Sequence, residues 1–224
     1  MFGRIARRYD LLNRLFSLGV DQRWRAKAIH HLQLHGSMKI LDCGAGTGDM
    51  SLAAHRANRS VETYLLDPAH EMLTIADGKA GYIHPMQFVM IRGAAERIPF
   101  HDETFERFMV AFGIRNFADL RGGMRELWRV LKPGGCGAIL EFTPDRSRRI
   151  DRAFRWYMRR VMTPVGGMIS GEAQAYGYLT RTVENFPVSG ELVKLFEEVG
   201  FQCREVTKLT LGIATLFIVA KPSR

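Results

Sequence analysis

The chain has 224 residues, 46% of them hydrophobic and 25% charged, which suits one globular domain with a full core. Its three cysteines, Cys43, Cys136 and Cys203, lie far apart and lack C-x-x-C spacing. This argues against a disulfide framework and a zinc site, and it makes a reducing cytoplasm the expected compartment. Because no run of about 18 apolar residues occurs, we expect no membrane-spanning helix.

The net charge of +9 predicts an anionic partner, either nucleic acid or a membrane surface. The positive charge is not spread evenly. Between Arg146 and Arg160 there are seven arginines and one acid, Asp151, which gives this stretch a net charge of +6. The anionic partner is therefore expected to contact this segment.

In chain order, hydrophobic spacing predicts helices over 2–35, with a break at Ser17–Gly19, and then strands separated by helices. The predicted strands end near Leu41 and cover 61–66, 88–91, 108–112, 137–142, 201–207 and 212–220, and the predicted later helices cover 51–58, 119–131 and 191–199. Alternating strands and helices indicate a mostly parallel sheet covered on both faces. The last two strands, joined by a short connection, are expected to pair antiparallel. An insertion at about 144–189 has no place in a minimal fold of this kind.

A glycine-rich turn follows the first strand, where Gly44, Gly46 and Gly48 let a backbone approach a ligand closely. Acids stand at both ends, Asp42 and Asp49. A dinucleotide fingerprint, G-x-G-x-x-G, would have its third glycine at the position of Asp49. A carboxylate there repels a pyrophosphate but suits a ligand with an ammonium and ribose hydroxyls. The pattern favours S-adenosylmethionine over NAD.

Asp67 comes 19 residues after Gly48, at the end of the second predicted strand. A carboxylate there can accept two hydrogen bonds from a ribose diol. This feature does not by itself separate NAD from S-adenosylmethionine, and the alternative is an exposed aspartate that begins a helix.

Together with the motif LKPGG and the antiparallel last strand, these features resemble the class I S-adenosylmethionine-dependent methyltransferases. Four stretches resemble more specifically the UbiE-type family, whose members C-methylate the rings of ubiquinone and menaquinone precursors: YDLLNRLFSLGVDQRW at 9–24, FGIRNF at 112–117, RVLKPGGCGAILEFT at 129–143 and AYGYLTRTVENFP at 175–187. The resemblance implies an α/β, Rossmann-like class I methyltransferase sheet of about seven strands. One domain, 1–224, would carry an N-terminal helical lid, 1–36, and the basic helical insertion, 144–189.

The resemblance also implies cofactor contacts from Thr47, Asp67 and the backbone at Ala94 and Ala95, with Glu96 near the adenine. Together with the turn residues Asp42, Gly44, Gly46 and Gly48, these form the predicted cofactor site. The chain departs from the family pattern at four positions: Asp21 for a histidine, Ala111 for a serine, Thr143 for a serine and Phe217 for a histidine. The departures leave the substrate quinone less defined than the cofactor.

Methylation of a hydroquinone ring carbon requires alignment with the methyl donor and removal of a hydroxyl proton. We expect Arg115, after the fourth strand, to stabilise the quinolate oxygen directly or through water, and Asn116 to orient it. Tyr9, Asp10 and Asn13 lie on the N-terminal helix that would close over the site; a core tyrosine and a solvated turn are the alternative. The remaining predicted substrate residues are Glu141, a proton acceptor or a partner for an arginine, and Tyr176 and Tyr178, which would flank the ring or pack internally.

The segment RSRRIDRAFRWYMRRVM places Ile150, Phe154 and Met158 on one helical face and arginines over much of the remainder. A basic amphipathic helix with an interfacial Trp156 is typical of a membrane-surface element. The alternative is a lid helix that packs on the core, and both descriptions can hold together.

The sequence thus predicts an S-adenosylmethionine-dependent C-methyltransferase of a polyprenyl quinol, with demethylmenaquinol as the first candidate. We expect it to be cytoplasmic and peripherally associated with the membrane, to bind no metal and no nucleic acid, and a homodimer is left open. The alternatives are a related methyltransferase of another phenol or lipid, and a basic nucleic-acid-binding protein. The aromatic residues on the apolar side of the arginine-rich helix disfavour the last of these.

Overall fold

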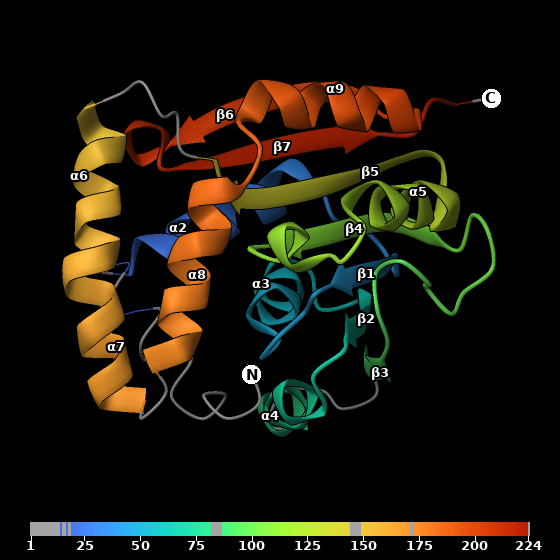
Figure 1. The fold of residues 1–224 in the computed structure, drawn as a ribbon. Helices are drawn as coiled ribbons and strands as arrows, with labels where there is room; N and C mark the ends of the chain where they lie inside the picture. Colours follow the sequence, from blue (N-terminus) through green and yellow to red (C-terminus); the bar gives the residue numbers. More distant parts are fainter. Residues whose placement is uncertain are drawn as a thin grey trace.

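The computed structural model describes residues 14, 17, 19–81, 87–143, 149–170 and 173–223. Within them one seven-stranded sheet has the order β3-β2-β1-β4-β5-β7-β6 (Figure 1). Strands β1 to β5 pair in parallel, and β7 is antiparallel to both β5 and β6. The predicted fold class is therefore confirmed. The strands are β1 Lys39–Cys43, β2 Glu62–Asp67, β3 Phe88–Arg92, β4 Phe105–Ala111, β5 Leu131–Phe142, β6 Gln202–Leu209 and β7 Ala214–Ala220.

Helices connect the strands and cover the sheet. They are α2 Val20–His31, α3 Asp49–Ala57, α4 His70–Gly81, α5 Leu120–Val130, α6 Arg149–Tyr157, α7 Thr163–Ser170, α8 Ala173–Asn185 and α9 Ser189–Val199. A π-helical segment, Met158–Met162, joins α6 to α7, and single 3-10 turns occur at Ile114–Asn116 and Thr210–Gly212. None of the helices among the described residues has the length and apolarity needed to cross a membrane.

Side chains of the central strands alternate between the two faces, as the pleat of a strand requires. Ile40 of β1 and Met109 of β4 pack into an apolar cluster with α2. Their neighbours Leu41 and Phe108 pack on the opposite face with α5 and α9. Because both faces are covered, these strands read as continuous apolar runs in the sequence.

Two strands begin at least three residues earlier than predicted. β4 begins at Phe105 rather than at 108, and β5 begins at Leu131, the predicted last residue of the preceding helix, rather than at 137. The reason is pairing with distant backbone: the amide of Gly134 donates to the carbonyl of Lys221 at 3.0 Å, and the amide of Lys221 donates to Gly135 at 3.0 Å. The chain after β7 thus holds the LKPGG stretch extended.

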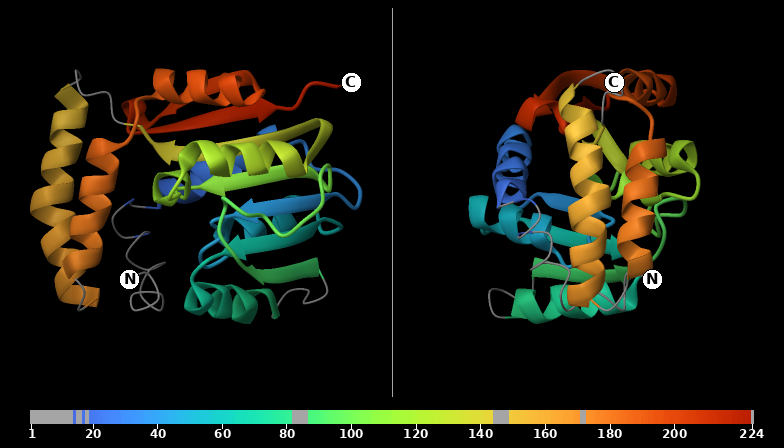
Figure 2. Two further views of the ribbon diagram at one scale, coloured as in Figure 1. Left: turned by 45° about the vertical axis from the view of Figure 1, so that its right-hand side comes forward. Right: turned by 60° about the vertical axis from the view of Figure 1, so that its left-hand side comes forward.

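Helices α6, α7 and α8 stand apart from the sheet, beyond the carboxyl ends of its parallel strands (Figure 2). The π-helical segment after α6 is joined to α8 by Arg159, whose Nε and Nη2 donate to the two carboxylate oxygens of Glu184, each at 2.7 Å. Phe154 of α6 reaches the sheet at Phe142, with ring centroids 5.8 Å apart. The predicted insertion is therefore a layer of helices beside the end of the sheet where a ligand is expected.

Candidate active site

The glycine turn lies between the end of β1 and the start of α3. Its backbone is held in place because the amides of Gly44 and Ala45 both donate to the carbonyl of Leu66, at 2.8 and 3.1 Å. Gly46 has φ +55, and a Cβ there would meet no atom within 4 Å, so it would enter open space in front of the turn. At Gly48, with φ +80, a Cβ would lie 3.1 Å from the Cβ of Ala76 on α4. Gly46 therefore leaves room for a ligand, whereas Gly48 allows close packing between helices.

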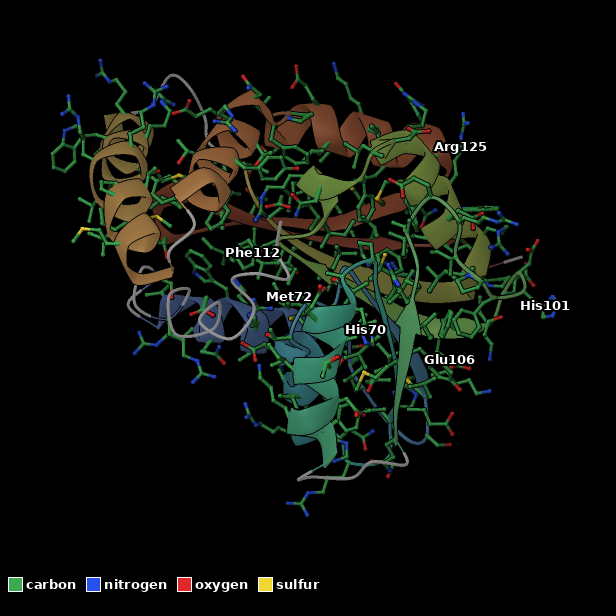
Figure 3. The ribbon with its side chains drawn as sticks, turned by 60° about the horizontal axis from the view of Figure 1, so that its bottom comes forward. His70, Met72, His101, Glu106, Phe112 and Arg125 are labelled. Atoms are coloured by element: carbon green, nitrogen blue, oxygen red, sulfur yellow. The ribbon has the colours of Figure 1, made fainter. Side chains whose placement is uncertain are left out.

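A pocket of about 400 Å³ opens in front of this turn, at the carboxyl ends of β1 to β4. This is the point where the strand order reverses, between β1 and β4, and open α/β sheets bind ligands there. Figure 3 shows Met72 and Phe112, which both line the pocket, near one another, whereas His101 and Glu106 lie at the other edge of the molecule. The lining comprises Arg25, 44–47, Asp49, 66–69, Met72, 93–96, 111–113, 116–118 and Tyr178.

Asp67 ends β2 at the wall of the pocket. Its Oδ2 accepts a hydrogen bond from the amide of Gly46 and its Oδ1 accepts one from the amide of Ala69, both at 2.8 Å. Burial raises the pKa of Asp67, and the two backbone hydrogen bonds limit the rise. The carboxylate is thus fixed in orientation, and its remaining lone pairs can accept hydrogen bonds from hydroxyl groups of a ligand.

The two acids that flank the turn have different positions. Asp42 is not part of the lining: it is buried beneath the turn, where its Oδ2 accepts hydrogen bonds from the amide and hydroxyl of Ser51 at 3.1 and 2.7 Å. Burial raises the pKa of Asp42 to about 6. Its position does not support the expected direct cofactor contact, because its carboxylate is used to anchor α3.

Asp49, by contrast, lines the pocket and accepts a hydrogen bond from Nζ of Lys79 at 2.8 Å. Partial burial acts to raise the pKa of Asp49, but the hydrogen bond and charge of Lys79, together with the charge of Arg25, hold it below its ordinary value. Three acids therefore face the pocket, Asp49, Asp67 and Glu96. Arg25 is the only basic residue among the described lining residues, so the pocket favours a cationic ligand over a pyrophosphate.

The far wall of the pocket is largely apolar, which suits a flat ring. It includes Leu66, Met72 and Phe117, with the backbone of 93–95. Glu96 is also in the lining, and its Oε1 accepts a hydrogen bond from the amide of Asp119 at 3.2 Å. The positions of Ala94, Ala95 and Glu96 are compatible with the predicted adenine contacts.

Comparison with known proteins identifies the family of the chain. Residues 1–221 match the ubiE/COQ5 methyltransferase family. The chain belongs to this family. It is 40% identical to the demethylmenaquinone methyltransferase of Deinococcus radiodurans over 97% of this chain and 90% of the relative. It is 41% identical to the ubiquinone/menaquinone biosynthesis C-methyltransferase UbiE of Geobacter sulfurreducens over 97% of this chain and 85% of that relative. The demethylmenaquinone methyltransferase of Thermus thermophilus is 39% identical over 99% of this chain and its own full length.

Solved structures support the fold at lower identity. A SAM-dependent methyltransferase from Aquifex aeolicus has a TM-score of 0.65 at 17% identity, covering 87% of this chain and 88% of that one. The [4+2]-cyclase SpnF has a TM-score of 0.72 at 14% identity, covering 91% and 81%. The ubiE/COQ5 membership makes this chain a methyltransferase, and S-adenosylmethionine is its methyl donor.

Within this methyltransferase, Arg115 and Glu141 form a buried ion pair behind the pocket. Nη1 of Arg115 lies 2.7 Å from Oε1 of Glu141, and their side chains are 4% and 0% exposed. Burial raises the pKa of Glu141 even though the charge of Arg115 opposes the rise. Neither residue lines the pocket, whereas Asn116, next along the chain, does. Of the two roles expected of Glu141, the structure shows the partner of an arginine, and of the two expected of Arg115, its position behind the pocket favours action through water over direct contact with the quinolate.

An aromatic cluster lies beside that pair. Phe112 lines the pocket with an unusual φ of +58, and its ring centroid is 4.6 Å from that of Phe142 and 6.1 Å from that of Trp24. A non-glycine residue in the left-handed region is strained and persists where the surroundings fix it. The hydrophobic pattern predicts a fourth strand that runs through Phe112. The strand ends at Ala111 because the backbone turns at Phe112.

The remaining predicted residues are placed as follows. Gly44, Gly46, Thr47 and Tyr178 line the pocket. Gly48 does not, and Tyr176 lies on α8. Tyr9, Asp10 and Asn13 lie outside the described residues. The sequence reasoning missed Arg25, Met72 and Phe117. A signal for Arg25 did exist, because it shares one helical stripe with Asp21, Trp24, Ala28 and Ile29, all of which are buried.

Cys43 is the last residue of β1, immediately before the turn, and its side chain is 1% exposed. Burial, together with the negative charges of Asp42, Asp67 and Glu96, raises the pKa of this thiol far above its ordinary value. The thiol is therefore protonated and unreactive in the folded protein.

Proposed function

We propose that this protein transfers the methyl group of S-adenosylmethionine to a ring carbon of a prenylated quinol, with demethylmenaquinol as the first candidate. The observation that carries the proposal is a pocket with an oriented carboxylate, Asp67, and excess negative charge, next to the aromatic wall formed by Phe112. The names of the curated relatives, demethylmenaquinone methyltransferase and UbiE, supply the substrate class.

The residues present fit the cofactor. Asp67 would accept hydrogen bonds from the ribose hydroxyls, and Gly46 leaves space where any side chain would intrude. Met72, Phe117 and the backbone at 93–95 would hold the adenine. Asp49 faces the pocket near the turn and would attract the ammonium group. When bound, the sulfonium supplies an activated methyl group, so the protein's task is to align a nucleophilic carbon with it.

The substrate side is built from different residues. Phe112 lines the pocket and is held by Phe142, Trp24 and Arg25, whose Cζ lies over its ring at 5.5 Å from the centroid, so it gives a quinol ring a fixed apolar wall to pack against. Asn116 and Tyr178 also line the pocket and supply polar groups. The guanidinium of Arg115 lies next to this wall, paired with Glu141 and 5.7 Å from the ring centroid of Phe142. In the proposal this positive charge favours loss of the quinol hydroxyl proton, and Asn116 contacts the oxygen.

The prenyl tail accounts for the exposed features of the α6–α7 helix. Trp156 is 63% exposed and Met168 is 85% exposed, which is unusual for large apolar side chains. Arg152 and Arg160 are exposed on the same continuous helix. We infer that this helix rests on an anionic membrane surface, with Trp156 at the interface and arginines near lipid phosphates. A substrate in the bilayer would then enter beside α8.

The decisive experiment is mass spectrometry of products after incubation with isotopically labelled S-adenosylmethionine and a panel of acceptors. The panel contains demethylmenaquinol, a demethylated ubiquinol precursor, and a simple phenol without a prenyl tail. We expect labelled methyl on a ring carbon of the demethylmenaquinol. Label on the simple phenol alone would overturn the quinol assignment, and no label on any acceptor would overturn the whole proposal.

The membrane contact is tested separately by co-sedimentation with vesicles. We expect binding to vesicles containing anionic phospholipid at low salt, weaker binding at high salt, and little binding to neutral vesicles. Absence of binding to anionic vesicles at low salt would remove the membrane contact and leave α6 and α7 as a cover for the site. Binding to single-stranded RNA instead would favour the nucleic-acid alternative.

A further inference from the structure

Arg25 is a buried arginine that the functions above do not use. It lies on α2 with 9% of its surface exposed, among the residues of that helix that face the sheet. It also lines the pocket, where it is the only basic residue among the described lining residues. A buried guanidinium is costly unless it is paired, so its place at this wall calls for an explanation.

The guanidinium is held firmly but is not fully hydrogen-bonded. Its Nε is 3.6 Å from Oδ2 of Asp21, which is an ion pair beyond hydrogen-bond length, and its Cζ is 5.5 Å from the ring centroid of Phe112. Nε has no hydrogen-bond partner among the described residues. Asp21 is itself held by Ser17, whose hydroxyl donates to its Oδ1 at 2.6 Å. Charge and stacking therefore fix Arg25 while leaving it hydrogen-bonding capacity.

The position of Arg25 matches one end of the proposed cofactor. Helix α2, which carries Arg25, packs in one apolar cluster with α3, the helix that follows the glycine turn, through residues such as Trp24 and Met50. In agreement with this position, the charge of Arg25 lowers the pKa of Asp49 at the start of α3. Arg25 is thus at the turn end of the pocket, whereas Asp67 is at the ribose end. S-adenosylmethionine carries one anionic group, its α-carboxylate, and that group is at the end of the molecule opposite the adenine.

We propose that Arg25 binds the α-carboxylate of the cofactor and so lets the pocket distinguish a nucleoside with an intact amino-acid tail from fragments that lack it. Guanidinium and carboxylate are geometrically matched, and their hydrogen bonds are among the strong ones. The inference rests on the proposed function in that S-adenosylmethionine must be the ligand. Asp49, close by, then receives the ammonium of the same tail, so both charges of the amino acid meet opposite charges.

The test is calorimetry with two ligands and no acceptor substrate. S-adenosylhomocysteine carries the carboxylate, and its decarboxylated analogue lacks only that group. For Arg25→Leu we expect affinity for S-adenosylhomocysteine to fall about 10- to 100-fold, the loss typical of a charge-assisted contact. Affinity for the decarboxylated analogue should change less than about threefold. In the wild-type protein, removal of the carboxylate from the ligand should cost about the same factor as removal of the arginine.

Arg23→Leu is the matched control, because Arg23 is exposed on the same helix, and it should alter neither affinity. If Arg25→Leu does not fold, Arg25→Gln keeps much of the stem and is measured in its place, with thermal unfolding as the check. Equal losses for both ligands, or an unchanged affinity for S-adenosylhomocysteine, would overturn the inference and leave Arg25 as a structural partner of Asp21. Failure of the wild-type protein to bind S-adenosylhomocysteine would instead overturn the proposed function.

Discussion

The two sides of the pocket are built on different principles. On the side of the glycine turn, polar groups are fixed by short hydrogen bonds from the backbone, as at Asp67. On the side of α6 to α8, contacts with the sheet are made by side chains such as Phe154, and large apolar side chains such as Trp156 face outward. The turn side is therefore suited to one rigid, polar ligand, while the helical side is suited to a bulky apolar one.

The Arg115–Glu141 ion pair joins the two sides of the pocket, and its removal should have the largest effect on the free energy of unfolding. In Arg115→Met an unpaired carboxyl would remain buried, and we expect the free energy of unfolding to fall by about 3–5 kcal/mol near pH 8. Urea titration measures this. The double variant Arg115→Met/Glu141→Leu should recover much of the loss, and a single-variant loss below about 1 kcal/mol would show that the pair does not hold the junction.

The loss of stability in Arg115→Met should also depend on pH. Burial raises the pKa of Glu141 in the folded state above its ordinary value. A carboxyl of this kind favours folding below its unfolded pKa, and that contribution is lost as pH rises through the folded pKa. Removal of the Arg115 charge extends this window upward, so the deficit of Arg115→Met should shrink as pH falls toward 5.

Asp42 offers a sharper pH test on the turn side alone. Its pKa is raised from 3.8 to about 6 by burial, so its contribution to stability is fully present below pH 3.8 and is lost as pH rises to about 6. The shift corresponds to about 3 kcal/mol. Compared with Asp42→Asn, the wild-type protein should therefore lose stability between pH 4 and pH 7, measured by urea titration. Parallel profiles for the two proteins would contradict this.

Asp67→Ala should weaken S-adenosylhomocysteine binding about 100-fold, or roughly 2.8 kcal/mol, because two hydroxyl contacts to a charged acceptor are removed. Calorimetry measures the affinity. Asp77→Ala, an exposed aspartate on α4, is the matched control and should leave the affinity unchanged. Vesicle binding by Asp67→Ala should equal that of the wild-type protein, since the change lies on the turn side only.

The smallest expected effect belongs to the helical side. Trp156→Ala should reduce partition onto anionic vesicles by about 1–2 kcal/mol, because an interfacial indole is removed. S-adenosylhomocysteine affinity should be unchanged, which is the reverse of the Asp67→Ala pattern. Val89→Ala is the control, because Val89 is an exposed apolar residue on the edge strand β3 and not on the α6–α7 helix. If Trp156→Ala changed both affinities equally, the separation between the two sides would not hold.

Much of the turn side could be predicted from the sequence because its signals are local. Glycines, a following helix and an acid at the end of the next strand are close together in the chain, and the structure unites Gly46 with Asp67 through one hydrogen bond. The mostly parallel sheet and the antiparallel β7 likewise followed from the spacing of elements, whereas the strand order did not.

The remaining features depend on contacts between distant residues. Glu141 and Arg115 are 26 positions apart, so the sequence suggested a partner for Glu141 but did not choose it. Asp42 and Asp49 look equivalent in the sequence, yet the pleat of β1 directs the first beneath the turn. The hydrophobic pattern predicts a strand through Phe112, because an apolar side chain gives no sign of the positive φ found at this residue. The misses in the site concern long-range contacts, side-chain direction and one backbone turn, whereas the early start of β5 concerns the kind of element, because Gly134 and Gly135 form hydrogen bonds with Lys221.

The position of Cys43 gives the protein a built-in reporter. Its side chain is 1% exposed and packs in the apolar cluster with Leu41 and Phe108, so an alkylating reagent can reach the sulfur only when that part of the molecule opens. The rate at which this one thiol is labelled, followed by peptide mass analysis, therefore measures how often this region opens. Binding of a nucleoside in the pocket should slow the labelling.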